Sequence, residues 1–249
     1  MSDEAAAVSF AQDVTLLQSI GMKIIVVHGG GPQIKLALDR LGIKTEFKAG
    51  YRVTDSETMR VVRMVLVGEV NQDVVARINQ AGGRAVGLSG ADGLLLAGRK
   101  VTVSGEDVGR VGIVESVNDA ELTLLTDGGV IPVISPVAID DEGHPLNVNA
   151  DLVAGKIAAH TKARKLLLMT DVDGVRSADG QVITSMHRAA AEELMNSEAV
   201  TGGMRPKLKC ALEALDGGVR KVHILDGRVK HAMLLELFTD TGVGTQVIQ

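Results

Sequence analysis

The chain has 249 residues, 45% of them hydrophobic and 23% charged, and its net charge is −5. This composition is typical of a folded globular protein with a sizeable core, and it excludes a disordered or collagen-like chain. The acidic balance, together with no Trp, one Tyr and three Phe, argues against binding to nucleic acid. The six histidines show no metal-ligand spacing, so no protein-held metal is expected.

The sequence also predicts the compartment. No apolar run approaches the roughly 20 residues that a membrane-spanning helix needs, and the acidic first residues carry no signal-peptide pattern. Cys210 is the single cysteine, which excludes an internal disulfide and indicates a reducing environment. We therefore predict a cytoplasmic protein that binds no membrane.

Short β-branched runs alternate with helical patterns along the chain. Strands are expected near residues 23–27, 130–134, 165–169 and 221–225. This alternation predicts an α/β fold, with an open and mainly parallel sheet that carries helices on both faces.

Capping residues mark the expected helix boundaries. Pro32 lies in the first turn of a helix that ends at Gly42. Thr54 and Glu57 have the spacing of a capping box, which predicts a helix up to about residue 66. A second helix is expected near residues 69–81, before a pair of glycines.

The glycine-rich stretch from residue 87 to 114 contains short apolar pieces, which predict small antiparallel strands inserted at the edge of the sheet. Strand–helix alternation resumes near residue 150, so we place a soft boundary near residue 145. The chain is predicted to form a single domain, 1–249, with functional halves 1–145 and 146–249.

Three glycines follow the first predicted strand, and we call residues 28–31 (His28, Gly29, Gly30 and Gly31) the glycine turn. Without Cβ atoms the backbone N–H groups can approach an anion closely, and the N-terminus of the following helix adds partial positive charge. The turn therefore predicts an acid or phosphate site, with a plain tight turn as the alternative. The G-x-G-x-x-G and Walker patterns are absent, so neither a Rossmann cofactor site nor a P-loop is indicated.

Two further segments offer groups for a small acid. Arg52 precedes a helix, and its planar guanidinium can hold a carboxylate with two hydrogen bonds. A surface ion pair is the alternative for Arg52. In the cluster of residues 147–151, Asn147 would bind substrate and Asp151 would orient cations, whereas simple capping of the next helix explains the same residues equally well.

The predicted strand at 165–169 ends in a polar turn that contains Asp171 and Asp173. Ligands of open α/β sheets gather at the carboxyl ends of strands, so a nucleotide site is expected here. The remainder of a calcium-binding loop does not follow, which excludes an EF-hand.

In the string of residues 201–207, two glycines precede Lys207 in the first turn of a helix that runs to about residue 215. Cations are unfavourable at helix N-termini, so this position indicates an anionic ligand, with a solvated surface lysine as the alternative. An ammonium group here would neutralise the charge that spreads in phosphoryl transfer.

The ordered set of these strings resembles the amino acid kinase family, and within it the branch that acts on N-acetyl-L-glutamate. The resemblance covers almost the whole chain and implies the carbamate-kinase-like three-layer sandwich fold. It also implies ATP-dependent phosphorylation of the side-chain carboxylate of N-acetyl-L-glutamate to N-acetyl-L-glutamyl 5-phosphate in arginine biosynthesis. The matching strings are residues 10–14, 28–33, 50–54, 147–151, 170–175 and 201–207.

By the same resemblance, Gly30, Gly31, Arg52 and Asn147 would bind acetylglutamate. Lys207 would stabilise the transition state, and Asp151 would position the lysines. Magnesium would be held chiefly by the nucleotide phosphates. The residues implied to hold ATP are Thr170, Asp171, Val172, Asp173, Gly174, Val175, Gly203 and Met204.

One departure concerns the opening of the chain. The family opens with a strand that ends in Lys-x-Gly-Gly, and this sequence contains no such opening. We expect the true start to lie upstream of Met1, with the motif in the cellular protein. A truncated, catalytically impaired homologue that binds arginine or a partner protein is the alternative.

The C-terminal region, residues 231–245, resembles the arginine-inhibited branch of the family, which implies an arginine site near His231, Glu236 and Gly242. A terminal amphipathic helix followed by an edge strand is the alternative for this pattern. A homodimer or hexamer is implied, with arginine feedback or binding of a signalling protein as implied regulation.

Overall fold

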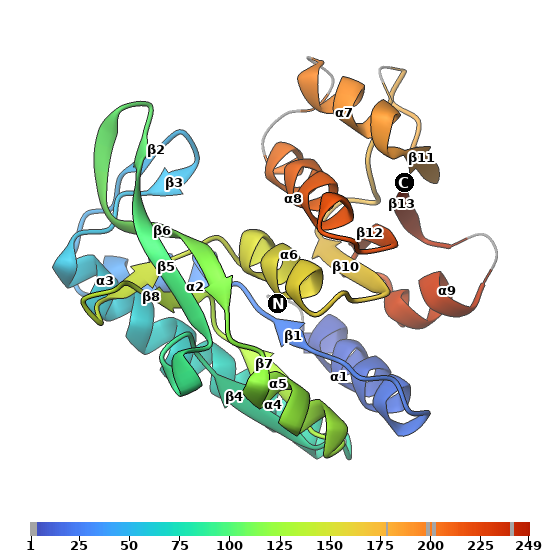
Figure 1. Cartoon of the computed structure of the whole chain (residues 1–249), viewed down its shortest axis with the longest axis horizontal. Coiled ribbons are helices and arrows are strands. Elements are labelled where there is room, and N and C mark those ends of the chain that lie inside the picture. Colours follow the sequence, from blue (N-terminus) through green and yellow to red (C-terminus); the bar gives the residue numbers. More distant parts are fainter. Residues whose placement is uncertain (1–3, 178, 198–199, 201–202, 240–241) are drawn as a thin grey trace. The chain divides into compact units, whose positions relative to one another are not determined.

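Figure 1 shows the computed structural model, which describes residues 4–177, 179–197, 200, 203–239 and 242–249. The chain packs as two compact units. We call Leu17–Val153 the middle unit, and Met1–Leu16 with Ala154–Gln249 the terminal unit. Within the described part of the chain, no helix has the length and apolar character required to cross a membrane.

The middle unit contains a parallel three-stranded sheet in the order β1-β7-β4. Its strands are β1 (Val26–Val27), β7 (Ile131–Ile134) and β4 (Ala85–Leu88). The central strand β7 is buried along its whole length, as expected for a parallel strand covered on both faces. Two of the predicted strands are therefore confirmed, although the first is shorter than expected.

A small closed barrel is the second part of the middle unit. It consists of β5 (Leu96–Val103), β6 (Glu106–Val117), β9 (Pro145–Asn147) and β8 (Val137–Ile139). The predicted antiparallel pairing is confirmed for β5 and β6, but their expected place at the edge of the parallel sheet is wrong. Register shifts in this pair mark irregularities of the kind that bend strands, and β6 then pairs with β9 and closes the barrel.

The helices of the middle unit begin with α2 (Gly31–Arg40), which has Pro32 in its first turn and a left-handed Gly42 just beyond its end, as predicted. The two helices expected next form one unbroken helical run. Its parts are α3 (Ser56–Arg63), the π-helix η1 (Met64–Val70) and α4 (Asn71–Gln80); α5 (Ala120–Asp127) follows later.

The predicted capping box at the start of α3 is wrong. Asp55 is the N-cap, and its carboxylate accepts from the Thr58 N–H at 2.7 Å, which lowers the pKa of Asp55. Thr54 is fully buried, pairs with Gly109 as an isolated β-bridge and donates its hydroxyl to the Arg52 carbonyl at 2.7 Å. Because tertiary packing holds Thr54 extended, its hydroxyl is not available to the helix.

The terminal unit has a mixed four-stranded sheet in the order β10-β12-β13-β11. β10 (Lys165–Thr170) and β12 (Lys221–Asp226) are parallel along six residue pairs and confirm the two remaining predicted strands. The antiparallel partner of β12 is β13 (Gly244–Ile248), which also pairs with β11 (Ser185–His187). Apolar residues of β10 and β12 share a hydrophobic cluster with α8 (Met204–Asp216).

Along the chain, the strands of this sheet alternate with three further helices, α6 (Ala150–His160), α7 (Arg188–Asn196) and α9 (Ala232–Phe238). The first helix of the chain is α1 (Glu4–Ser19). The α/β class with parallel sheets and helices is thus confirmed. The parallel strands lie in separate sheets, β1-β7-β4 in the middle unit and β10-β12 within the mixed sheet of the terminal unit, and further parallel pairs occur in the barrel.

Candidate functional site

The glycine turn connects β1 to α2 in the middle unit. Gly30 is the N-cap of α2, and its carbonyl accepts from the Ile34 N–H at 2.9 Å. The N–H groups of a first helical turn have no acceptor within their own helix. The turn therefore lies where α2 can bind an anion, as predicted from the sequence.

The space around each glycine shows whether packing requires a residue without a side chain at that position. A Cβ atom on Gly30 would lie 2.6 Å from Leu66 Cδ2, so packing against the π-helix requires this glycine. A Cβ atom on Gly31 would meet nothing within 4 Å, and the φ of Gly31 is not positive. Neither packing nor backbone conformation requires glycine at position 31, and a residue without Cβ leaves the backbone open to close approach.

Arg52 ends β3 (Tyr51–Arg52), the second strand of the hairpin with β2 (Phe47–Lys48). Its side chain is buried, and its guanidinium carbon lies 4.7 Å from the centre of the Phe47 ring. Nη1 donates to Thr45 Oγ1 at 2.7 Å and Nη2 to the Gly31 carbonyl at 3.4 Å. Burial lowers the pKa of Arg52, and Asp39 partly opposes this shift.

Arg52 is therefore not the surface ion-pair partner that the alternative prediction required. Among the described residues no carboxylate forms a salt bridge with it, and the contacts above use two of its five N–H groups. The buried guanidinium lies beside the glycine turn and has N–H groups that these contacts do not use. It can therefore bind an anionic ligand with two parallel hydrogen bonds.

Asn147, at the end of β9, joins the same hydrogen-bonded chain. Its amide donates to Thr54 Oγ1 at 3.2 Å, and Thr54 in turn bonds the Arg52 carbonyl. The structure thus brings together Gly31, Arg52 and Asn147, three of the four residues predicted to bind the acid, and Gly30 is adjacent in the turn.

Asp151 lies in the first turn of α6. The Asp151 and Leu152 N–H groups donate to Asn149 Oδ1 at 2.9 and 3.2 Å, so Asn149 caps the helix. A Cβ atom on Gly29 would lie 3.9 Å from the Ala150 Cβ, which places the start of α6 beside the glycine turn.

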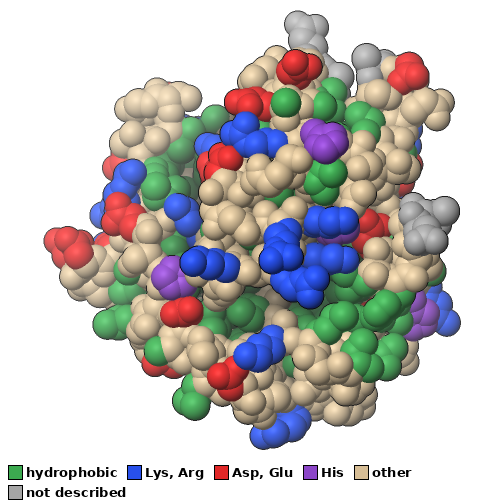
Figure 2. Space-filling model, turned by 45° about the vertical axis from the view of Figure 1, so that its right-hand side comes forward, with side chains coloured by type: hydrophobic (Ala, Val, Ile, Leu, Met, Phe, Trp, Pro, Cys, Tyr) green, Lys and Arg blue, Asp and Glu red, His purple; other side chains and the backbone are tan. Residues whose placement is uncertain are grey.

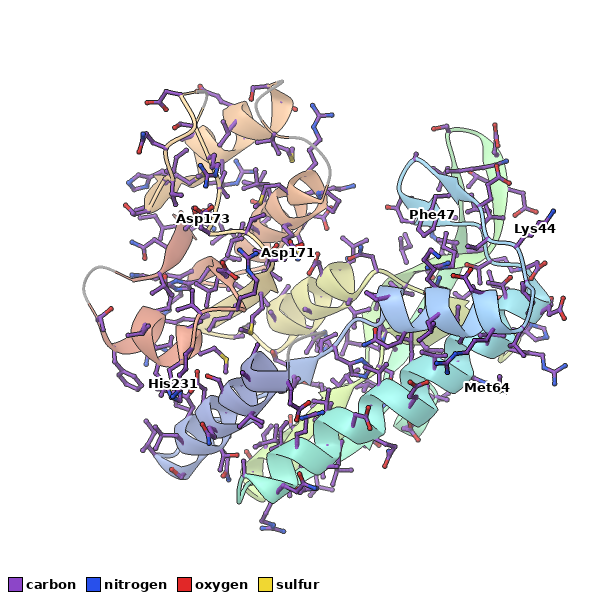
Figure 3. All side chains as sticks on the ribbon, turned by 180° about the vertical axis from the view of Figure 1, so that it is seen from behind. Lys44, Phe47, Met64, Asp171, Asp173 and His231 are labelled. Carbon is purple, nitrogen blue, oxygen red and sulfur yellow. The ribbon has the colours of Figure 1, made fainter. Side chains whose placement is uncertain are left out.

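The expected nucleotide residues lie in the terminal unit, where β10 ends at Thr170. Asp171 and Asp173 are exposed after this strand (Figure 3), and Asp173 forms a 2.7 Å salt bridge with Arg176. Gly174 has φ +140 and would place a Cβ atom 2.7 Å from Thr245 Oγ1, so a side chain there is strained and blocked.

The loop that follows β10 is anchored by Thr245, a fully buried residue of β13. Its hydroxyl accepts from the Val175 N–H at 2.8 Å, while Val172 stays exposed. This arrangement fixes the end of the loop and leaves its polar tip accessible, which is suitable for a ligand at a strand end.

The matching end of β12 was not predicted from the sequence. Asp226 lies opposite Thr170, and Gly227 N–H donates to the Thr170 carbonyl at 2.8 Å. Arg228 bonds Asp226 at 2.7 Å, and this bond, with Asp171 and Asp173 nearby, raises the pKa of Arg228. An apolar strand that leads into Asp and Gly is the same signal that identified residues 170–174.

The helix predicted after residue 203 is α8. Gly203 is its N-cap, Met204 its first residue, and Lys207 lies at the end of its first turn. Thr201 and Gly202 of the same string lie outside the described residues.

The predicted regulatory residues also belong to the terminal unit. Buried Glu236 bonds His223 Nδ1 at 2.6 Å and accepts from the Val243 N–H at 2.7 Å. A Cβ atom on Gly242 would lie 2.6 Å from Glu236 Oε2. His231, which Figure 3 labels, has left-handed backbone geometry and pairs through Nδ1 with Asp13 of α1 at 2.6 Å.

One group of potential metal ligands occurs at the turn after β8. Ligand atoms of Asp140, Glu142 and His144 lie within 4.8 Å of one another. Asp140 already accepts from Arg110 at 3.1 Å and from the His144 N–H at 2.7 Å, which explains the cluster as a turn. It supports no metal assignment.

A glycine turn at a helix N-terminus, a buried arginine beside it and polar strand ends define an α/β enzyme for a small anionic substrate. The model of the amino acid kinase family matches residues 1–226. The chain belongs to the amino acid kinase family, and the predicted phosphotransferase class is confirmed.

Named relatives are similar along nearly the whole chain. Acetylglutamate kinase of Pelobacter propionicus is 52% identical over 256 residues, which cover 99% of this chain and 88% of that protein. Acetylglutamate kinase of Halorhodospira halophila is 49% identical over 257 residues, covering 99% and 86%.

Solved structures show the same fold. N-acetylglutamate synthase from Neisseria gonorrhoeae matches with a TM-score of 0.88 at 24% identity over 99% of this chain. This chain spans 57% of the length of the synthase chain. Carbamate kinase from Giardia lamblia matches with a TM-score of 0.68 at 15% identity, covering 97% of this chain and 90% of that chain. The predicted carbamate-kinase-like fold is confirmed.

Proposed function

We propose that the chain phosphorylates the side-chain carboxylate of N-acetyl-L-glutamate with ATP, in the cytoplasm, as a step of arginine biosynthesis. The observation that carries this proposal is buried Arg52, which is hydrogen-bonded to Gly31 and linked through Thr54 to Asn147. The relatives named acetylglutamate kinase favour this substrate and an active enzyme over a non-catalytic homologue.

In the proposed reaction Arg52 and Asn147 hold the substrate while its side-chain carboxylate lies against the N–H groups of Gly30 and Gly31. A carboxylate oxygen attacks the γ-phosphorus of ATP, the bond to the β-phosphate oxygen breaks, and ADP leaves with the electron pair. The product is an acyl phosphate, N-acetyl-L-glutamyl 5-phosphate. The protein supplies position and positive partial charge, which are the main requirements of phosphoryl transfer.

ATP is proposed to bind the terminal unit at residues 170–175 and at Gly203 and Met204, with Mg²⁺ held chiefly by its phosphates. Although the chain is acidic overall, Figure 2 shows Lys and Arg side chains gathered on one face. Lys207 is proposed to stabilise the transferring phosphoryl group, and Asp151 to orient the cationic groups.

A coupled ADP-release assay tests the proposal. We expect turnover with N-acetyl-L-glutamate and ATP, and at least about 100-fold lower kcat/KM with L-glutamate, L-aspartate or carbamate, because a site built to bond a polar group strongly rejects ligands that lack it. Equal or faster turnover with one of the other acids would reassign the substrate.

We further propose that the chain is a homodimer or hexamer and that L-arginine or a signalling protein regulates it through residues 231–245. Glu236 supports this because its carboxylate holds the segment after Gly242 through the Val243 N–H. We expect arginine to inhibit turnover and Glu236→Gln to weaken that inhibition severalfold, since a neutral amide is a weaker acceptor than a carboxylate. Arginine titrations of both proteins, with light scattering for their mass, decide this; equal inhibition would contradict it.

A further inference from the structure

Three buried polar side chains lie together at the start of the glycine turn. We call them the His28 network: His28, Asn71 and Ser135. They are the residue after β1, the first residue of α4 and the residue after β7. Asn71 Nδ2 lies 3.1 Å from His28 Nε2, and Ser135 Oγ lies 3.3 Å from the same nitrogen. His28 belongs to the predicted glycine turn, but neither Asn71 nor Ser135 was singled out from the sequence, since each follows an otherwise ordinary apolar segment.

The bonds of the network define the state of the imidazole. His28 Nδ1 lies 2.9 Å from the Gly29 carbonyl oxygen, which can only accept, so Nδ1 carries the proton. Asn71 Nδ2 donates to the Val133 carbonyl at 2.9 Å and to Nε2, which must then be the unprotonated nitrogen. Burial lowers the pKa of His28, in agreement with a neutral ring.

We propose that Asn71 is a positioning residue, which holds His28 in the tautomer that bonds the Gly29 carbonyl and thereby aims the Gly30 N–H. No described peptide bond is cis. In a planar trans peptide the carbonyl of Gly29 and the N–H of Gly30 point in opposite directions. Because His28 bonds the Gly29 carbonyl, that carbonyl points toward the network. The Gly30 N–H therefore points away from the network, to the side where an anion can bind.

The surroundings of Asn71 favour this role. A Cβ atom on Gly87 of β4 would lie 1.9 Å from Asn71 Oδ1, so the neighbouring strand leaves space for this amide. The Asn71 N–H donates to the Leu66 carbonyl, the wider i to i−5 spacing of the π-helix. The side chain of Leu66 packs against Gly30, so the π-helix and the first residue of α4 both contact the glycine turn.

Stability alone does not require this network. Polar side chains buried here are costly unless every donor is satisfied, and apolar residues of the same shape serve a core at least as well. The network is useful where the orientation of one peptide plane matters. The inference rests on the proposed function, because the anion is the acid that this function assigns to Gly30 and Gly31.

Asn71→Leu is expected to lower kcat/KM for N-acetyl-L-glutamate about 10- to 100-fold, because a small misplacement of a binding group has effects of this order. The KM for ATP should stay within about twofold, since the changed peptide belongs to the acid site. Asn79→Leu is the matched control, because Asn79 lies on the same helix and bonds the Ala85 main chain at 2.7 Å, two turns from the network. Equal kinetic losses in both variants, after correction for their thermal stability, would overturn the proposal.

Gly87→Ala provides a second variant that removes no hydrogen-bonding group. Its methyl group would displace the Asn71 amide and should reproduce the kinetic change of Asn71→Leu. Nitrogen NMR of the histidine rings reads the tautomer directly: we expect Nδ1–H at His28 in the unmodified protein and loss of this pure tautomer in both variants. An Nε2–H tautomer in the unmodified protein would overturn the positioning role whatever the substrate. Absence of turnover with acetylglutamate would instead overturn the proposed function.

Discussion

Substitution of Arg52 by Gln is expected to lower kcat/KM for N-acetyl-L-glutamate about 100- to 1,000-fold, mainly through KM. Arg52 is buried, and its guanidinium contacts the Gly31 carbonyl and Thr45, so it is pre-oriented before the acid binds. Removal of one partner from a buried pair of charges has an effect of this size. Arg52→Lys should recover little activity, because an ammonium keeps the charge but lacks the planar fork.

Arg110→Gln is the matched control for Arg52. Arg110 is also partly buried in the middle unit, where it bonds Asp140 at 3.1 Å. Its loss should affect thermal stability more than kcat/KM. Steady-state kinetics of the three variants, with both substrates varied, measure the effect. An unchanged KM for acetylglutamate in Arg52→Gln would remove Arg52 from the site.

Replacement of Lys207 by Ala should lower kcat about 100- to 1,000-fold, with little change in the affinity for acetylglutamate. Loss of one charge-stabilising group from a phosphoryl-transfer site has an effect of this order, because the group acts mainly on charge that develops in the transition state. Lys207 lies at the end of the first turn of α8, just after the N-cap Gly203.

Lys209→Ala tests whether the position on α8 matters. Lys209 lies on the same helix and pairs with Glu213 at 3.8 Å. Both variants change the net charge equally, so a loss of kcat in Lys207→Ala alone excludes a general electrostatic effect. Single-turnover kinetics separate chemistry from release of ADP. Equal activity of the two variants would contradict the assigned role.

Much of the fold was predictable because local chemistry determines it. Pro32 and Gly42 limit α2, since the ring of proline suits a first helical turn and glycine accepts the left-handed conformation after the last. The parallel strands were predicted for a similar reason, since strands of parallel sheets covered on both faces have continuous apolar runs. The prediction of a capping box was wrong because Thr54 forms a β-bridge with Gly109, which is distant in the sequence. No local pattern reveals this pairing.

The candidate site shows the same division between local and tertiary determinants. By itself, the sequence determined the glycine turn and the polar end of β10, because each depends on residues that are neighbours along the chain, and it determined the family through the order of such short strings. Only the tertiary structure decided that Arg52 is buried against Gly31 and that Asn71 lies beneath His28. These contacts join residues 21 and 43 positions apart, and their geometry depends on how the π-helix and the hairpin pack.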